Sequence, residues 1–387
     1  MPRRCKHTLV SLVAAVGTAP AFGAIVEVRS EADLQAAVAA AVPGTEIAIA
    51  PGRYLLTRRL TLGPGQSGTA SQPVVIRPLA ASRSATIDGN GNEEAFYVPG
   101  GRFVTIRGLK ITGGAYHGVK IDAPSHHVRV EGSEIWDNTR APDVDSQFSA
   151  VKGGGTCAPG CVADVALVGN LIHQDTLFAG NNFQGVDCNS CLRWLVQANR
   201  IVNIRGATLA GTGIQFKSGS VGTTIERNVV IGSGLVGINY GGFGTPAWGR
   251  EAHEHVGGVV RNNVVTGSAD AGISVIDTVG GRVVHNTLWG NGFTPDVRRF
   301  ASGLVYRNNI LDRPLNLRDG TGASVGGNLV LAAPTEAGLF VAAAQGDLHL
   351  RATARRAINR VRALVSNDLD GQPRPRGRLA DIGADER

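Results

Sequence analysis

The sequence has few aromatic residues, a single methionine and no long apolar run. Phe, Trp and Tyr make up 5% of its 387 residues, whereas Gly occurs 53 times. This composition does not suit a thick core of large rings; it suits many tight corners around a thin core. The apolar stretch from Leu9 to Val16 is too short to cross a bilayer, and nothing later resembles a membrane helix. We therefore expect no membrane span.

A short motif that ends in Asn recurs along the chain. Each copy is an apolar run followed by a turn, as in Leu167-Val168-Gly169-Asn170. The final residues of the copies are Asn138, Asn170, Asn199, Asn228, Asn262, Asn286, Asn308 and Asn328, separated by 32, 29, 29, 34, 24, 22 and 20 residues. Self-similarity at a period of roughly 20–50 residues indicates a solenoid.

The repeats contain short β-branched runs broken by Gly and Asn, without a helical stripe, so each repeat is a coil of strands. Asn tolerates the left-handed bend between strands, and stacked Asn side chains can hydrogen-bond from coil to coil. A β-sandwich also has Asn in its turns, but it does not explain why Asn keeps one phase. The sequence predicts an all-β fold, a right-handed parallel β-helix within residues 24–330.

Both ends of the solenoid have candidate caps. Residues 31–41 form the best helical segment, with Ser30 as N-cap and Pro43-Gly44 as the stop. Its apolar face would cover the first coil, as a terminal repeat requires; that face consists of Leu34, Ala37, Val38 and Ala41. Residues 331–387 change character, and we expect them to fold back over the last coil as a C-terminal capping segment.

The N-terminal residues have the features of a signal peptide. A basic start, Met1 to Lys6, precedes the apolar stretch, and a small-residue cleavage site lies at residues 19–23. We expect residues 1–23 to be removed and the protein to be secreted or periplasmic. Removal takes away three basic residues, so the formal charge falls from +7 to +4. This weakly basic balance suits an anionic polysaccharide partner, and we expect a monomer that binds no nucleic acid.

Four cysteines remain after this cleavage, as Cys157-x3-Cys161 and Cys188-x2-Cys191. An even number in an exported chain indicates two disulfides. Pairs within each cluster close very small loops, and pairing across the stack is the alternative because the clusters lie about one coil apart. A four-cysteine zinc site is a third interpretation, which an oxidising compartment disfavours.

A second motif also recurs in the coils: Gly or Ala, then an inward-facing apolar residue, as in Gly118-Val119-Lys120. Because strand residues alternate between faces, the residues after the inward one form an outer ladder. The ladder consists of Lys120, Lys152, Asp187, Gln215 and Asn239, with Asp122 and Lys217 two places further along. A solvated strand face is the plain interpretation of such residues. A binding face is the alternative, because the ladder is rich in charges and amides.

Long insertions open from the coils that carry this ladder, at residues 139–148, 174–184 and 241–255. Loops on one side of a regular scaffold usually build a binding site. The last insertion begins after Tyr240 and holds Trp248, Arg250, His253 and His255, which suit stacking on sugar rings and holding carboxylates. The H-x-H pair is a weak metal signal.

Several of these segments together resemble the pectate-lyase-like right-handed β-helix proteins, and within them the alginate lyase and chondroitinase B group of polysaccharide lyases. The segments are Pro43–Ile47, Pro51–Tyr54, Gly68–Ile76, Ile106–Ile111, Gly213–Gly242 and the C-terminal run from Asp370 to Ala384. The resemblance implies a lyase that acts on a uronate-containing glycan.

Lys217-Ser218 matches the Lys-Ser pair that the resemblance implies as the general base. The next coil reads Gly237-Ile238-Asn239-Tyr240-Gly241, where the group has Arg-His-Gly, and residues 208–212 lack the acidic calcium ligands that usually precede the pair. We therefore expect no cofactor, with calcium as the alternative.

β-Elimination needs a base at the proton beside the carboxylate and a cation on that carboxylate. We assign the base to Lys217 or Lys152, the proton donor to Tyr240 and the carboxylate to Arg250 or the remaining lysine. We assign substrate binding to Lys120, Asp187, Gln215, Asn239, Trp248 and His253. A non-catalytic glycan-binding or surface-structural β-helix is the alternative function.

Overall fold

The structure is a computed structural model that describes residues 25–141, 146–157, 160–176, 179–180, 182–206, 211–242, 252–299, 301–319, 322–331 and 338–387. The predicted signal peptide lies outside these ranges, and so do Trp248 and Arg250, two candidate site residues of the insertion at 241–255. No helix among the described residues is long and apolar enough to cross a membrane.

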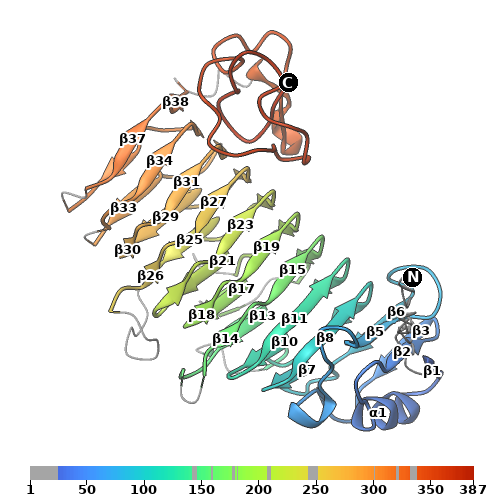
Figure 1. Ribbon diagram of the computed structural model, residues 1–387. Helices are drawn as coiled ribbons and strands as arrows, with labels where there is room; N and C mark the ends of the chain where they lie inside the picture. The colour runs from blue at the N-terminus through green and yellow to red at the C-terminus, as the bar shows by residue number, and fades with distance from the viewer. Residues whose placement is uncertain are drawn as a thin grey trace, which may run out of the picture.

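The chain winds into a right-handed parallel β-helix with three long parallel sheets, and Figure 1 shows its coils stacked in a row. In every full coil the chain passes from sheet A to sheet B and then to sheet C. The predicted fold is confirmed.

Within the described residues, to which the strand numbers of all three sheets refer, sheet A has 17 short strands. They are β1 (Ile25–Val28), β2 (Glu46–Ile49), β5 (Val74–Pro78), β8 (Arg102–Arg107), β11 (His126–Glu131), β14 (Val162–Ala163), β15 (Ala166–Val168), β18 (Cys191–Leu192), β19 (Leu195–Gln197), β22 (Ser220–Val221), β23 (Thr224–Glu226), β26 (His255–Val256), β27 (Val259–Arg261), β30 (Thr278–Val279), β31 (Arg282–Val284), β34 (Val305–Arg307) and β37 (Ser324–Gly326).

Sheet B has 11 strands. They are β3 (Gly52–Leu55), β6 (Ala85–Asp88), β9 (Lys110–Thr112), β12 (Glu134–Trp136), β16 (Leu171–His173), β20 (Arg200–Val202), β24 (Val229–Ile231), β28 (Val264–Thr266), β32 (Thr287–Trp289), β35 (Ile310–Leu311) and β38 (Leu329–Val330).

Sheet C has 10 strands and carries the predicted ladder. They are β4 (Leu60–Thr61), β7 (Glu94–Pro99), β10 (His117–Asp122), β13 (Phe148–Gly154), β17 (Phe183–Asn189), β21 (Thr212–Lys217), β25 (Ile238–Gly241), β29 (Ile273–Ile276), β33 (Asp296–Arg298) and β36 (Asn316–Leu317).

A helix closes the N-terminal end of the solenoid, as predicted. Helix α1 spans Glu31–Ala39, and the Ser30 hydroxyl accepts a hydrogen bond from the Asp33 N–H. Leu34, Val38 and Ala41 are buried in the main core. A short 3-10 helix, η1 (Pro64–Gln66), follows β4.

A continuous ladder of Asn side chains links the coils at the corner between sheets A and B. After the first Asn of the ladder, the Oδ1 atom of each Asn accepts the backbone N–H and the Nδ2–H of the Asn in the preceding coil, at 2.8–3.0 Å. The ladder consists of Asn170, Asn199, Asn228, Asn263, Asn286, Asn309 and Asn328. Coil-to-coil hydrogen bonding by Asn is therefore confirmed.

Three of the Asn residues that the repeat predicted to stack do not belong to this Asn ladder. Asn262 and Asn308 precede the ladder residues and adopt left-handed backbone angles, with φ of 54° and 61°. Where two Asn residues adjoin, the first takes the bend and the second joins the ladder. Asn138 lies at the next corner, where its Oδ1 accepts the Gly114 N–H, and Ser133 takes its place by donating its N–H to Asn170.

Removing one rung of this ladder should destabilise the protein. In Asn228→Ala, two buried donors of Asn199 lose their acceptor, at a cost of about 1–3 kcal/mol each in the free energy of unfolding. Denaturant titration measures the loss. Asn203→Gly is the matched control, because Asn203 is an exposed left-handed residue outside the ladder and should change little. Equal stability of the two variants would contradict the role of the ladder.

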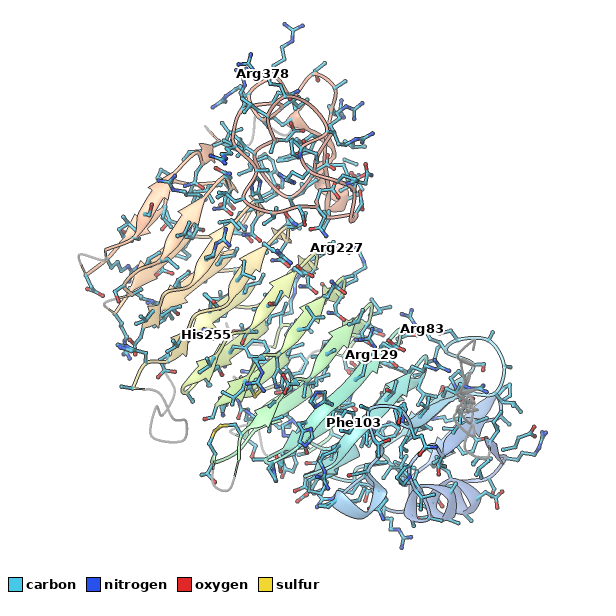
Figure 2. The ribbon with its side chains drawn as sticks, in the orientation of Figure 1. Arg83, Phe103, Arg129, Arg227, His255 and Arg378 are labelled. Carbon is cyan, nitrogen blue, oxygen red and sulfur yellow. A yellow bond between two sulfur atoms is a disulfide. The ribbon has the colours of Figure 1, made fainter. Side chains whose placement is uncertain are left out.

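The C-terminal segment packs against the side of the solenoid and not over the last coil alone. It contains β39 (Phe340–Ala342), η4 (Ala343–Gln345) and β40 (Asp347–Leu350), and β39 and β40 pair antiparallel. Its apolar residues form a second core with Val264, Ile310 and Leu329 of sheet B and with Leu331, which follows the last strand of that sheet. Arg227 donates to the Leu369 carbonyl oxygen, and it lies where the segment meets the coils (Figure 2).

The four cysteines form two local disulfides, Cys157–Cys161 and Cys188–Cys191. Pairing across the stack and the four-cysteine zinc site are therefore both excluded. Cys188 and Cys191 flank the turn at the end of β17, one residue beyond Asp187, so the second bridge fixes the edge of sheet C beside the ladder.

Candidate functional site

The predicted outer ladder lies in register across sheet C. Strand pairing aligns Lys120 with Lys152, Lys152 with Asp187, Asp187 with Gln215 and Gln215 with Asn239. The row continues through Ser274 to Asp296. The inward neighbours from Val119 to Ile273 are fully buried, as alternation required.

The small residue, Gly or Ala, that precedes each inward residue has a packing reason. A Cβ on Gly118 would lie 2.8 Å from the Ala150 carbonyl oxygen and 2.8 Å from Ile135 Cγ2. Two consecutive residues therefore face the core at this corner, and only a very small first residue fits. As a consequence, His117 joins the outer face, where Lys152, Lys120 and Asp187 act on its charge. Simple alternation had concealed this residue.

The centre of the ladder is buried, so it is not the solvated face of the plain interpretation. Asp187 is 0% exposed and Lys152 is 9% exposed. The Lys152 ammonium donates to Asp187 Oδ2 and also to Gln147 Oε1 at 2.9 Å. Buried charges persist only when they are paired and hydrogen-bonded in this way.

The pKa values of this pair shift for identifiable reasons. Burial, with repulsion from Lys217 and Lys120, lowers the pKa of Lys152 although Asp187 opposes the shift. Burial disfavours the charge on Asp187, but Lys152 and Lys217 outweigh it and hold the pKa of that carboxyl below its usual range. The outer face of sheet C is thus a cluster of coupled charges at low dielectric, which is typical of functional sites.

Asp187 also fixes the direction of a chain of amides. A carboxylate only accepts, so Gln215 presents Nε2–H to Asp187 Oδ1 at 2.9 Å. Gln215 Oε1 then accepts from Asn239 Nδ2 at 3.0 Å. This order leaves Asn239 Oδ1 as a buried acceptor without a donor in the part of the chain that the structure describes.

Two more buried polar atoms on this face lack a partner within the described ranges, His117 Nδ1 and Asn189 Oδ1. Burial lowers the pKa of His117 to about 3, with help from Lys152 and Lys120, so its ring is neutral. Buried atoms of this kind are uncommon in native proteins, and three of them around one ion pair indicate a place for a polar ligand.

Lys217 lies beside this cluster at the end of β21, aligned with Asn189. It is half-buried, and its ammonium forms no hydrogen bond or ion pair with any residue in the described ranges. The turn behind it is held firmly, because the Ser218 N–H donates to Glu254 Oε2 at 2.7 Å and the N–H groups of Gly219 and Ser220 donate to the Glu254 carbonyl oxygen. The root of the 241–255 insertion therefore positions Lys217.

The first end of the ladder is more exposed. Lys120 lies 3.6 Å from Glu94 and 3.7 Å from Asp122, and its ammonium is 5.6 Å from the centre of the Tyr97 ring. Arg59 stacks on the same ring at 4.1 Å. Tyr97 and Arg59 were missed from the sequence because they belong to the early, irregular coils.

The assignment of Tyr240 as the proton donor was wrong. Tyr240 is fully buried, and its hydroxyl donates to the Gly257 carbonyl oxygen. Burial strongly raises the pKa of this phenol. The reason is alternation: Asn239 faces outward, so its neighbour Tyr240 must face the core.

The two histidines of the H-x-H pair do not converge on a metal. His255 is fully buried, stacks on Tyr240 at 4.3 Å and lies with Nε2 3.0 Å from Thr223 Oγ1, and Figure 2 marks its position. His253 lies apart from it, with Nδ1 2.7 Å from Asp277 Oδ1. His253 thus remains near the turn that follows Lys217, whereas Trp248 and Arg250 lie outside the described residues.

Comparisons with known proteins address the fold. No family model matches the sequence, and no curated protein matches it. The structure is similar to pectate lyase Pel9A, with a TM-score of 0.57 and 17% identity over 91% of this chain and 90% of that one. It is also similar to an alginate lyase from Paenibacillus sp. str. FPU-7, with a TM-score of 0.52 and 20% identity over 79% of this chain and 99% of that one.

A third solved structure, the PL6 family alginate lyase AlyGC, gives a TM-score of 0.51 and 17% identity over 78% of this chain. The match spans 40% of AlyGC, so AlyGC extends well beyond the shared β-helix. At these identities the likeness concerns the path of the backbone. This chain therefore has the right-handed parallel β-helix fold of the alginate and pectate lyases.

Proposed function

We propose that this protein is an exported polysaccharide lyase that cleaves a uronate-containing glycan by β-elimination. The observation that carries the proposal is the half-buried Lys217 ammonium, without a partner in the described ranges, beside the buried Lys152–Asp187 pair. The likeness to alginate and pectate lyases supports the same reaction class. Two disulfides support an oxidising compartment.

Lys217 is the better of the two candidate bases. Lys152 donates to Asp187 and Gln147, so its nitrogen is less free than that of Lys217 to accept a proton from the substrate. Such a cation suits the uronate carboxylate, because it neutralises the charge that builds up when the neighbouring carbon loses its proton. Lys120 is the second cation for this role.

The proposed elimination moves one proton and breaks one glycosidic bond. The amine nitrogen of Lys217 takes the proton from the carbon that bears the carboxylate. The electron pair of that C–H bond forms the new carbon–carbon double bond, and the bond to the glycosidic oxygen breaks. The leaving oxygen takes a proton from protonated Lys217 or from water, because Tyr240 is buried. Asn239 Oδ1 accepts a sugar hydroxyl and orients the ring.

The direct test is the formation of unsaturated chain ends. Purified mature protein is incubated with alginate, pectate and chondroitin, and ultraviolet absorbance follows the new double bond. We expect absorbance to rise with one of these polymers. No rise with any uronate polymer would remove the lyase proposal.

A non-catalytic glycan-binding protein is the second candidate. It is favoured by the burial of Tyr240, which leaves the described face of sheet C without the proposed side-chain proton donor. Calorimetric titration with the same polymers separates the two: binding without unsaturated ends supports a binding protein.

A further inference from the structure

A second cluster of ligand-type side chains lies in the C-terminal segment, away from sheet C. His349, Asp370 and Asp385 each offer one ligand atom, and these three atoms lie within 4.8 Å of one another. In the described part of the chain this is the one group of three His, Cys, Asp or Glu residues at such spacing. His349 Nε2 lies 3.0 Å from Asp370 Oδ2.

A fourth residue orients the imidazole. Asp347 Oδ1 lies 2.5 Å from His349 Nδ1 and also accepts the His349 backbone N–H at 3.1 Å. When the ring is neutral, a carboxylate that accepts from Nδ1 leaves Nε2 with a lone pair, and an ion bound there would replace the direct contact between Nε2 and Asp370. This arrangement is the usual outer shell of a metal-binding histidine.

The third ligand indicates that the group is more than exposed acids. Asp385 is only 7% exposed. One of its oxygens accepts the Leu350 N–H at 2.7 Å, and the other accepts no hydrogen bond from the described residues. That second oxygen is open to solvent and free to bind an ion. Three carboxylates surround one imidazole, so negative charge is in excess.

We propose that His349, Asp370 and Asp385 bind a divalent transition-metal ion such as Zn²⁺. One imidazole nitrogen with carboxylate oxygens suits Zn²⁺, whereas Ca²⁺ prefers oxygen ligands alone. His349 and Asp370 are partly exposed, so the ion can enter and water can complete its coordination.

The ion would cross-link three stretches of the C-terminal segment: β40, the turn at residues 367–371, and the chain end. Leu348, Leu350, Leu369 and Ala384 from these stretches all pack in the second core against sheet B. Metal binding would therefore fasten the segment to the solenoid and stabilise the folded state.

The test is calorimetric titration of the full mature chain with Zn²⁺ after treatment with a chelator. We expect one ion per chain, loss of binding in His349→Ala and in Asp370→Asn, and affinity about 10–100-fold weaker in Asp347→Asn. The matched control is His173→Ala. His173 also lies between two carboxylates, Asp175 and Glu134, but no third ligand joins it, so this variant should bind as the wild type does.

Three outcomes would overturn the proposal. Absence of Zn²⁺ binding by the wild type would mean that protonated His349 itself balances the carboxylates. Unchanged binding in both His349→Ala and Asp370→Asn would place the ion elsewhere. Equal affinity for Ca²⁺ and Zn²⁺ would contradict a role for the imidazole. Circular dichroism of the variants checks that they remain folded.

Discussion

Turnover of a uronate polymer should fall by about 10²–10⁴-fold in Lys217→Ala, because this substitution removes the general base of the elimination. Folding should persist, since the Lys217 side chain forms no hydrogen bond or ion pair with the described residues and its backbone hydrogen bonds are unchanged by the substitution. The measurement is the initial rate of ultraviolet absorbance on the polymer that the wild type degrades.

Two further variants sharpen this result. Lys217→Arg should not restore turnover, because a guanidinium stays protonated and cannot accept the proton. Lys110→Ala is the matched control: Lys110 is a partly exposed lysine on sheet B that lies 3.7 Å from Glu134, and its loss should leave the rate unchanged. Wild-type turnover in Lys217→Ala would remove Lys217 from the mechanism.

The largest effect on stability is expected for Asp187→Asn. This substitution leaves the Lys152 ammonium buried without its counter-charge, which costs about 3–5 kcal/mol in the free energy of unfolding. Denaturant titration at neutral pH measures the loss. The double variant Lys152→Met with Asp187→Leu removes both charges and should recover most of the stability. Equal stability of Asp187→Asn and the wild type would show that the pair is not buried in solution.

The difference in stability between the wild type and Asp187→Asn should depend on pH. The folded-state pKa of Asp187 is lowered, so the stabilising contribution of its ionised form is fully present above the unfolded value of about 3.9. It is lost as the pH falls through the folded value. The stability difference between the wild type and Asp187→Asn should therefore narrow below about pH 4.

Much of the fold and the alignment of the site were available from the sequence. In a parallel solenoid every coil repeats the same phase, so the Gly-Val-Lys pattern at Gly118 was sufficient to align Lys120 with Asn239 across sheet C. The Asn ladder was visible for the same reason. Its register failed at Asn262 and Asn308, because two adjacent Asn residues are equivalent by composition and only the backbone angle distinguishes them.

The burial of the site could not be predicted in the same way. The alternation of strand residues predicts that Lys152 faces outward. Gln147, which accepts a hydrogen bond from Lys152, precedes the strand and so is not covered by this alternation. His117 was concealed because two consecutive residues face the core at Gly118. The assignment of Tyr240 as proton donor failed for a different reason. Alternation along the strand already places this side chain inward, but the assignment rested only on the chemistry of a phenol beside the insertion.

We propose above that the outer face of sheet C holds a uronate for elimination by Lys217. The most direct measurement is a crystal structure of Lys217→Ala soaked with an oligouronate from the polymer that the wild type degrades. We expect a uronate carboxylate within hydrogen-bonding distance of Lys152 or Lys120, a sugar hydroxyl on Asn239 Oδ1, and the proton-bearing carbon facing position 217. An oligosaccharide bound to sheet A or sheet B would contradict it.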